Sequence, residues 1–234
     1  EVVHFTAKYW IYIFIAGVSQ ILATVLMVQL FKQKNYAIGV GLAKSEAILA
    51  AIIGVAFLSN HLSFLAWIGV LIGGYAVFLL SKGNQLSGLS AKTLMIGVGS
   101  GLCFAITSLL VREASLELTN LPVLHRASWV LISVIGFQCI SMLIYLSLFS
   151  RKTLVAMRER MGLTMKVGFC SFTASLGWFT AMSMMSVPVV KTLGQIEILF
   201  SMLISAYFFK DKLAKAEHWG LVLVVIAAIL VIWA

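Results

Sequence analysis

Two carboxylates lie inside apolar stretches of the sequence, where a charged group is costly. Glu46 lies within LAKSEAILAAIIGVAFLS, and Glu197 lies within KTLGQIEILFSMLISAYFF. Acidic residues are rare in membrane-spanning helices, and those present usually have a partner or a function. Each glutamate therefore predicts one of two arrangements. Either the carboxylate stabilises a close helix–helix contact through hydrogen bonds, or it faces a cavity and binds a proton or a cationic group of a solute.

Small residues follow both glutamates at helical spacing. Positions i+4 and i+8 hold Ala50 and Gly54 after the first glutamate, and Ser201 and Ser205 after the second. Such rows let another helix approach closely. The first row is apolar and suits packing, whereas the second keeps hydroxyl groups near its acid.

Further polar residues lie within the apolar segments and are candidates to contact a solute or a proton. Such residues stabilise helix packing at least as often as they bind ligands. Lys191 is also long enough to extend toward a membrane interface. The complete candidate set is Glu197, Gln195, Lys191, Glu46, Lys44, Gln20, Thr24, Trp178, Ser175 and Thr107.

The sequence holds no constellation typical of an enzyme, a metal site or a nucleic-acid-binding protein. The three cysteines and four histidines match no metal-binding spacing, and no nucleophile lies beside a base. The basic residues give a net charge of +9 but are scattered between apolar segments without interleaved aromatic residues. We therefore expect no catalytic residue, no cofactor, no metal and no nucleic-acid partner.

The segments that carry the candidate residues have the composition of membrane helices. Hydrophobic residues make up 62% of the chain, charged residues make up 11%, and the mean hydropathy is +1.06. Most apolar segments hold about 20 residues, enough to cross a bilayer as a helix. We therefore expect an all-α polytopic membrane protein with eight transmembrane helices, at residues 9–31, 36–58, 64–81, 92–112, 124–149, 162–185, 187–209 and 217–234.

The basic residues predict the orientation of these helices, because successive loops alternate across the membrane. One side carries 11 of the 17: Lys32, Lys34, Lys82, Lys92, Arg151, Lys152, Arg158, Arg160, Lys210, Lys212 and Lys215. The other side carries Lys8, Arg112 and Arg126. The positive-inside rule makes the first side cytoplasmic and places Ala234 on the opposite face.

The sequence contains a weak internal repeat. An offset of 151 residues superposes residues 9–81 on residues 160–232 without a gap and aligns the apolar segments. It pairs the two buried acids, Glu46 and Glu197, and also Lys44 with Gln195. Other identical pairs are Gly17 and Gly168, Ala23 and Ala174, Leu42 and Leu193, Phe57 and Phe208, and Gly69 and Gly220.

The repeat has a consequence for topology. The first three apolar segments recur as the last three, and two segments lie between, so the repeat unit has five helices. An odd number of helices reverses the second copy in the membrane, which is the inverted-repeat arrangement of many secondary transporters. Residues 1–81 then hold the last three helices of the first repeat, with two further helices expected before Glu1. Residues 82–234 hold the five helices of the second.

The five-plus-five pattern and two stretches of sequence resemble a known transporter family. The chain resembles the ten-helix drug/metabolite transporter superfamily, EamA-type permeases, in two stretches: VKTLGQIEILFSMLISAYFFKDKL (190–213) and LAKSEAILAAIIGVAFLSNHLS (42–63). The first stretch is followed by a last apolar segment with an early glycine, as in that family. The resemblance implies a carrier of small metabolites or drugs in a cytoplasmic membrane, commonly an exporter. Its central cavity would be lined by the first, second, fourth, sixth and seventh segments. Both termini would be cytoplasmic, which disagrees with the charge count for Ala234.

These observations together predict a secondary transporter rather than an enzyme. It would move a small organic metabolite or drug-like solute across a bacterial inner membrane by alternating access, as an exporter with or without proton coupling. A membrane-embedded enzyme and a non-transporting accessory or receptor subunit are the alternatives. Its partners would be the solute and membrane lipid.

The sequence also yields two finer expectations. A GxxxG row, Gly69 and Gly73, favours close packing within a monomer over a weak homodimer. The polar residues near Glu197 lead us to expect that it matters more for transport than Glu46, whose neighbours suit helix packing.

Overall fold

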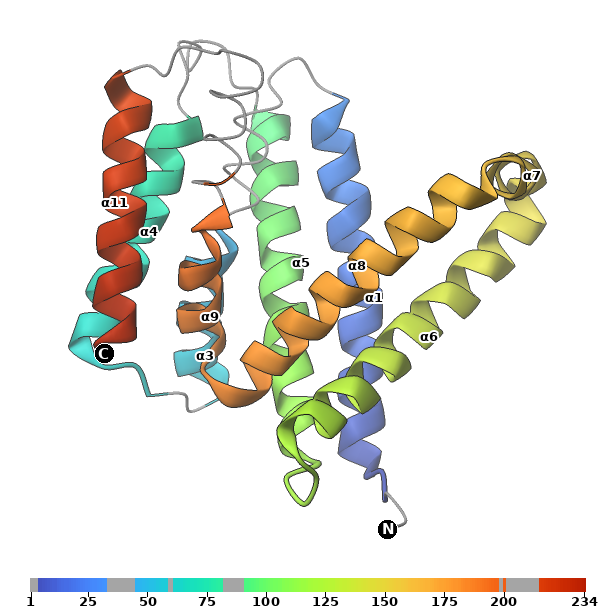
Figure 1. Ribbon diagram of the computed structural model, residues 1–234, viewed down its shortest axis with the longest axis horizontal. Helices are drawn as coiled ribbons and strands as arrows, with labels where there is room; N and C mark the ends of the chain where they lie inside the picture. The colour runs from blue at the N-terminus through green and yellow to red at the C-terminus, as the bar shows by residue number, and fades with distance from the viewer. Residues whose placement is uncertain (1–3, 33–44, 59–60, 82–90, 198–199, 201–214) are drawn as a thin grey trace. The chain divides into compact units, whose positions relative to one another are not determined.

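The computed structural model describes residues 4–32, 45–58, 61–81, 91–197, 200 and 215–234. In this part of the chain the fold is entirely helical, without a β-strand, which confirms the all-α class (Figure 1). Each predicted apolar segment contains a helix where it is described. The helices are α1 (Ala7–Phe31), α3 (Glu46–Phe57), α4 (Phe64–Ser81), α5 (Ala91–Leu116), α6 (Val123–Phe149), α7 (Arg151–Glu159), α8 (Met161–Met184), α9 (Val187–Gly194) and α11 (Lys215–Ile232).

Three of these helices are long and apolar enough to cross a membrane, namely Ala7–Leu30 of α1 and the whole of α5 and α6. Helices α3, α4 and α11 contain shorter apolar stretches, Glu46–Phe57, Phe64–Leu80 and His218–Ile232. Helix α9 ends at Gly194, whereas the predicted segment extends to residue 209. Most of that remainder, residues 198–199 and 201–209, lies outside the described part of the chain.

Helix α7 occupies a stretch that the hydropathy pattern assigns to a loop between two apolar segments. Its sequence, RKTLVAMRE, holds no proline or glycine and is rich in residues with good helix propensity. Hydropathy alone treats a charged stretch of this length as a connection, although its residue types allow a helix.

The described helices group into two compact units. The first unit holds α6, α7 and α8, together with α1 up to Ile21 and α5 from Leu110. The second holds α3, α4, α9 and α11, together with the rest of α1 and α5. Each unit therefore combines segments from both sides of residue 82, where the predicted repeats meet.

In the first unit, two arginines hold the C-terminal end of α8. Arg112 of α5 donates a hydrogen bond to the carbonyl oxygen of Met182, and Arg126 of α6 donates to that of Ser183, each at 2.8 Å. The Ser115 hydroxyl donates to the Ser183 hydroxyl at 2.6 Å. The last carbonyl groups of a helix lack intrahelical partners and carry partial negative charge, so cations are favourable there.

The same unit packs α1 against α6 through a buried tyrosine. Tyr9 is fully buried, and its hydroxyl is 2.8 Å from Ser133 Oγ and donates to the carbonyl oxygen of Trp129 at 3.2 Å. Gly17, farther along α1, lies directly against the ring of Phe137. The absence of a side chain at Gly17 lets the two helices approach closely.

In the second unit, α4 and α11 lie side by side and share a small-residue interface (Figure 1). A Cβ atom at Gly69 would lie 2.5 Å from Val231 Cγ2 and 3.1 Å from the carbonyl oxygen of Ala227. A Cβ atom at Gly73 would lie 3.4 Å from Ala227 Cβ. Both glycines of the predicted GxxxG row therefore face another helix of the same chain.

A second glycine contact at this interface repeats the first. A Cβ atom at Gly220 of α11 would lie 2.5 Å from Leu80 Cγ and 3.4 Å from the carbonyl oxygen of Ala76. Each of these residues differs by 151 from its counterpart in the contact made by Gly69. Exchanging α4 with α11 therefore converts one contact into the other, as a two-fold axis between them would.

Candidate functional site

Glu46 and Lys191 form an ion pair between α3 and α9 in the second unit. Glu46 Oε1 lies 2.6 Å from Lys191 Nζ. Glu46 occupies the first turn of α3 and Lys191 the last turn of α9. An acid is favourable at the positive end of a helix dipole and a base at the negative end. The dipole of each helix therefore stabilises the charge that the helix carries, independently of the contact between α3 and α9.

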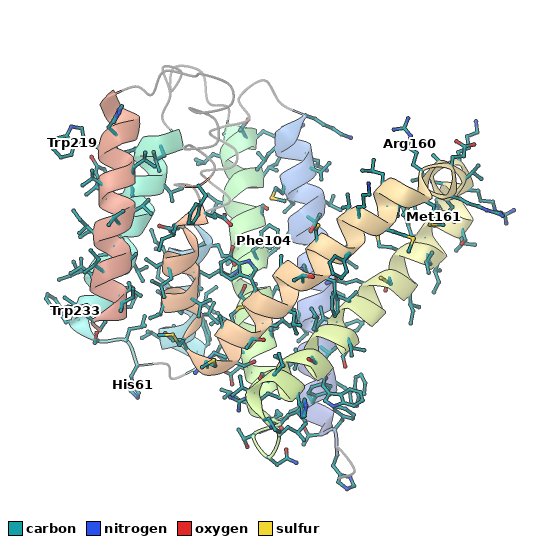
Figure 2. All side chains as sticks on the ribbon, viewed as in Figure 1. His61, Phe104, Arg160, Met161, Trp219 and Trp233 are labelled. Atoms are coloured by element: carbon teal, nitrogen blue, oxygen red, sulfur yellow. The ribbon has the colours of Figure 1, made fainter. Side chains whose placement is uncertain are left out.

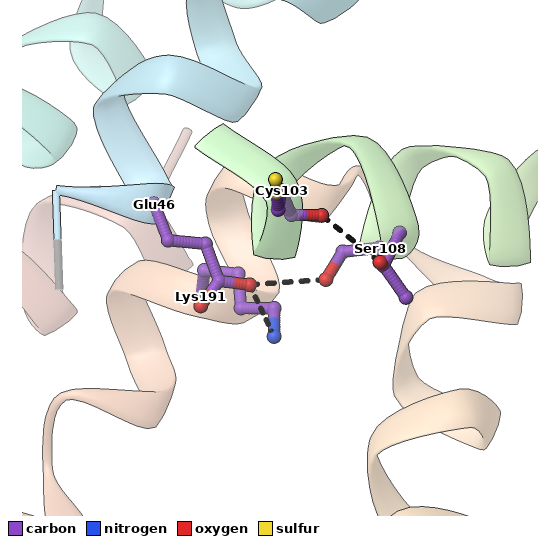
Figure 3. A network of polar contacts seen from close by, with 5 residues as sticks. Glu46, Cys103, Ser108 and Lys191 are labelled. Atoms are coloured by element: carbon purple, nitrogen blue, oxygen red, sulfur yellow. Dashed lines mark hydrogen bonds and ion pairs between the residues drawn. The ribbon is translucent and has the colours of Figure 1, made fainter. Parts of the chain in front are cut away.

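A serine of α5 completes this cluster (Figure 3). Ser108 Oγ donates a hydrogen bond to Glu46 Oε1 at 3.0 Å. The neighbouring Thr107 was the predicted candidate, but its hydroxyl donates to the carbonyl oxygen of Cys103 in its own helix at 2.9 Å. The sequence carried a signal for Ser108, because Ser100, Ser108 and Ser115 recur along α5 at intervals that keep one helix face, and all three are buried.

The pair lies in a largely apolar setting. The side chains of Glu46 and Lys191 are 15% and 16% exposed. Four small residues on one side of α3, Ala47, Ala50, Ala51 and Gly54, are buried. Removing a buried charge from water costs several kcal/mol, and only a well-placed partner offsets this cost. The two groups therefore depend on each other, and whatever separates them must replace the lost interaction.

A second polar group lies one turn farther along, beside α4. Gln195 follows the end of α9 and is only 2% exposed. Within the described residues, neither polar atom of its side chain has a hydrogen-bond partner, and the same holds for the buried hydroxyl of Thr192. A Cβ atom at Gly73 would lie 2.7 Å from Gln195 Oε1 and 3.1 Å from Thr192 Cγ2. The glycine thus provides the space that the amide occupies.

This geometry predicts that Gln195→Met stabilises the protein. Burying an amide without a hydrogen-bond partner is unfavourable, and methionine has a similar shape without the polar atoms. We expect the free energy of unfolding to rise by about 1 kcal/mol. Thermal unfolding in detergent would measure the change. A lower unfolding temperature would instead mean that a water molecule or a solute satisfies the amide.

Three other predicted candidates, Glu197, Thr24 and Lys44, fall within the sequence ranges of the second unit. Glu197 is exposed, in contrast to Glu46, and Lys191 contacts the acid of the other repeat. Thr24 of α1 is exposed. Lys44 lies outside the described residues.

The remaining candidates belong to the first unit. Gln20 of α1 accepts a hydrogen bond from Nε2 of Gln138 in α6 at 2.9 Å, so it takes part in helix packing. Ser175 and Trp178 of α8 are half-buried. Of the described candidates, Glu46 and Lys191 form an ion pair, and Ser108, which was not among the predicted residues, joins them.

The chemistry of the Glu46 cluster is that of an ion pair and its hydrogen bonds. Across the described ranges of the chain, no group of three or more histidine, cysteine, aspartate or glutamate side chains could hold a metal ion. The cluster itself offers one carboxylate, one ammonium group and one hydroxyl. Such a set can exchange a proton or a cationic partner, because the carboxylate can bind either in place of the lysine.

Comparison with known proteins gives the fold but not the family. No family model and no curated protein matches the sequence. A solved structure described only as "Crystal structure of protein" superposes with a TM-score of 0.68 at 14% sequence identity, covering 99% of this chain and 79% of the other. The chain thus shares its helical fold with a protein of known structure.

Proposed function

We propose that the protein is a secondary transporter that moves a small organic solute across a cytoplasmic membrane by alternating access. The observation that carries the proposal is the largely buried Glu46–Lys191 pair, which joins α3 of the first predicted repeat to α9 of the second. Ionisable residues inside membrane bundles mark solute and proton pathways more often than they serve stability.

The surface of the helices supports a membrane location. Large apolar side chains are exposed along α1, α6 and α8, as expected for helices that face lipid. Trp219 and Trp233, at opposite ends of α11, are 68% and 82% exposed (Figure 2). Tryptophan is enriched at both membrane interfaces. We therefore extend the three long apolar helices to the eight spans predicted from the sequence.

The contacts between α4 and α11 support the inverted repeat on which alternating access depends. Gly69 and Gly220 exchange equivalent contacts, so the two helices meet about an approximate two-fold axis. Transporters with this symmetry change the face that is open by moving one repeat against the other. An EamA-type drug/metabolite transporter remains our proposal for the family.

The ion pair gives a physical route to coupling. While Glu46 holds Lys191, its charge is neutralised and α3 stays against α9. A proton or a cationic group of the solute that binds Glu46 replaces this interaction and releases Lys191. Glu46 is largely buried and ion-paired, whereas Glu197 is exposed. We therefore assign coupling to Glu46 rather than to Glu197, which reverses the order expected from the sequence.

Proteoliposomes loaded with a fluorescent pH indicator would test the assignment. A panel of small cationic, zwitterionic and neutral solutes is added outside, and solute-dependent proton movement is recorded. We expect Glu46→Gln to reduce this movement by about a hundredfold or more, the scale expected when an essential proton-transfer group is removed. Glu197→Gln is the matched control and should stay close to the parent.

Folding and coupling can be separated with the double variant Glu46→Gln/Lys191→Gln. It removes both charges together and should assemble like the parent, yet move solute without pH dependence. If Glu197→Gln loses the pH response and Glu46→Gln keeps it, then Glu197 is the coupling residue, as predicted from the sequence, and the assignment to Glu46 is wrong. Absence of any solute movement across the whole panel by the parent would count against a transporter.

A further inference from the structure

The short helix α7 concentrates positive charge between two long apolar helices. Residues 151–160 hold four basic side chains and one acid, Glu159. The basic residues are Arg151, Lys152, Arg158 and Arg160, and all are exposed. Arg151 Nε donates to the carbonyl oxygen of Ser147 at 2.9 Å, whereas the structure gives the other three no acidic partner among the described residues.

One face of α7 is apolar. Leu154 and Met157 lie three residues apart, which places them on one side of α7, and Met161 begins α8 just beyond its end. Met157 is 44% exposed and Met161 is 50% exposed. Arg151 and Arg158 border this stripe on one side, and Arg160 follows the last residue of the helix. Helices with an apolar stripe flanked by basic residues lie at the boundary between lipid head groups and acyl chains.

The direction of α7 fits this placement. In Figure 1, α7 is seen end-on at the junction of α6 and α8, which both run across the view. Helix α7 therefore crosses the two long helices steeply, and it would lie in the membrane plane if they span the bilayer. Figure 2 shows Arg160 extending outward at this junction.

The adjoining ends of the long helices carry apolar and aromatic residues. The rings of Tyr145 and Phe149 contact each other at the end of α6, tilted by 37° with centroids 5.3 Å apart, and both are exposed. Leu163 and Met165 are exposed at the start of α8. Aromatic residues that give way to basic ones are typical of the interface layer of a membrane.

We propose that α7 is an interfacial helix that binds anionic phospholipid head groups. The inference rests on the membrane location in the proposed function. The apolar stripe would enter the outer edge of the acyl region, and the guanidinium groups of Arg158 and Arg160 would bind phosphate oxygens, for which their paired donors are suited. Since the α7 side carries most of the basic residues of the chain, the lipid would belong to the cytoplasmic leaflet.

A site-specific quenching experiment tests this. The full chain, with Cys103, Cys139 and Cys170 replaced by serine, receives Ala156→Cys on α7 and an environment-sensitive fluorophore at that position. It is reconstituted in phosphatidylcholine vesicles that contain equal amounts of spin-labelled phosphatidylglycerol or spin-labelled phosphatidylcholine. We expect spin-labelled phosphatidylglycerol to quench the fluorophore about fivefold more strongly than spin-labelled phosphatidylcholine, because a basic residue near an anionic membrane surface contributes about 1 kcal/mol to binding. Added salt should reduce the difference.

Charge variants decide whether the basic residues of α7 are responsible. Lys152→Gln/Arg158→Gln/Arg160→Gln should abolish the difference between the two lipids. Lys8→Gln/Lys32→Gln/Lys92→Gln removes the same charge from exposed positions on α1 and α5 and should preserve it. Equal quenching by both lipids in the parent would overturn the proposal. So would a preference that survives in the α7 variant.

A second probe separates this inference from the proposed membrane location. A chain that keeps only Cys139, an exposed residue within α6, reports on the apolar region. Quenching there without quenching at position 156 would mean that α7 lies away from the lipid, for instance under an acidic protein partner, and would refute the proposal. Absence of quenching at both positions would refute the membrane location itself.

Discussion

Replacing Glu46 with glutamine should lower the free energy of unfolding by about 3–5 kcal/mol, the usual cost of removing one partner from a buried ion pair. The loss arises mainly from Lys191, whose ammonium group loses the carboxylate that lies 2.6 Å away in a largely apolar setting. Glutamine can still accept the hydrogen bond from Ser108, so the substitution isolates the charge. Thermal or denaturant unfolding of the detergent-solubilised protein would measure the effect.

A double-mutant cycle makes this test specific to the pair. Lys191→Met should also destabilise strongly, whereas Glu46→Gln/Lys191→Met should recover much of the loss, because no buried charge remains. Glu159→Gln removes an exposed acid on α7 and should change stability by less than about 0.5 kcal/mol. Additive effects of the two single changes would show that the pair does not hold α3 against α9.

The second large effect concerns the interface between α4 and α11. Gly69→Ala should destabilise by about 2–3 kcal/mol, because the new methyl group would meet Val231 and, at 3.1 Å, the backbone carbonyl oxygen of Ala227. A backbone atom cannot change rotamer to avoid the clash, so α4 and α11 must move apart. Gly220→Ala should cost less, since its nearest atoms belong to the side chain of Leu80 and the backbone oxygen of Ala76 is 3.4 Å away.

Glycines without close neighbours provide the control for this comparison. A Cβ atom at Gly136 of α6 or at Gly177 of α8 would meet nothing within 4 Å. Alanine at either position should stabilise by about 0.5–1 kcal/mol through helix propensity alone. Unfolding temperatures of the four variants in one detergent would give the order. Equal effects of alanine at Gly69 and at Gly177 would contradict the close packing of α4 against α11.

The order of these effects also bears on the predicted repeat. Gly69 and Gly220 make equivalent contacts, yet the two contacts differ in tightness. The repeat thus supplies an approximately symmetric interface between α4 and α11.

Local composition was enough to predict the helical class, the approximate positions of the apolar helices that the structure describes, and the need of Glu46 for a partner. An apolar run of sufficient length forms a helix in a membrane whatever its neighbours, and a carboxylate within it needs a partner. The close packing of Gly69 also followed from residue spacing, because small residues on one face favour the approach of another helix.

Which groups meet depends on tertiary packing and could not be predicted from the sequence. The fold pairs Lys191 with Glu46, far away in the sequence, and uses Ser108 where its neighbour Thr107 was predicted. A shift of one residue rotates a side chain by about 100° around a helix, and hydropathy does not resolve this rotation. The helical state of α7 and its steep crossing of α6 and α8 also became visible only in three dimensions, because charge content alone does not separate an interfacial helix from a solvated loop.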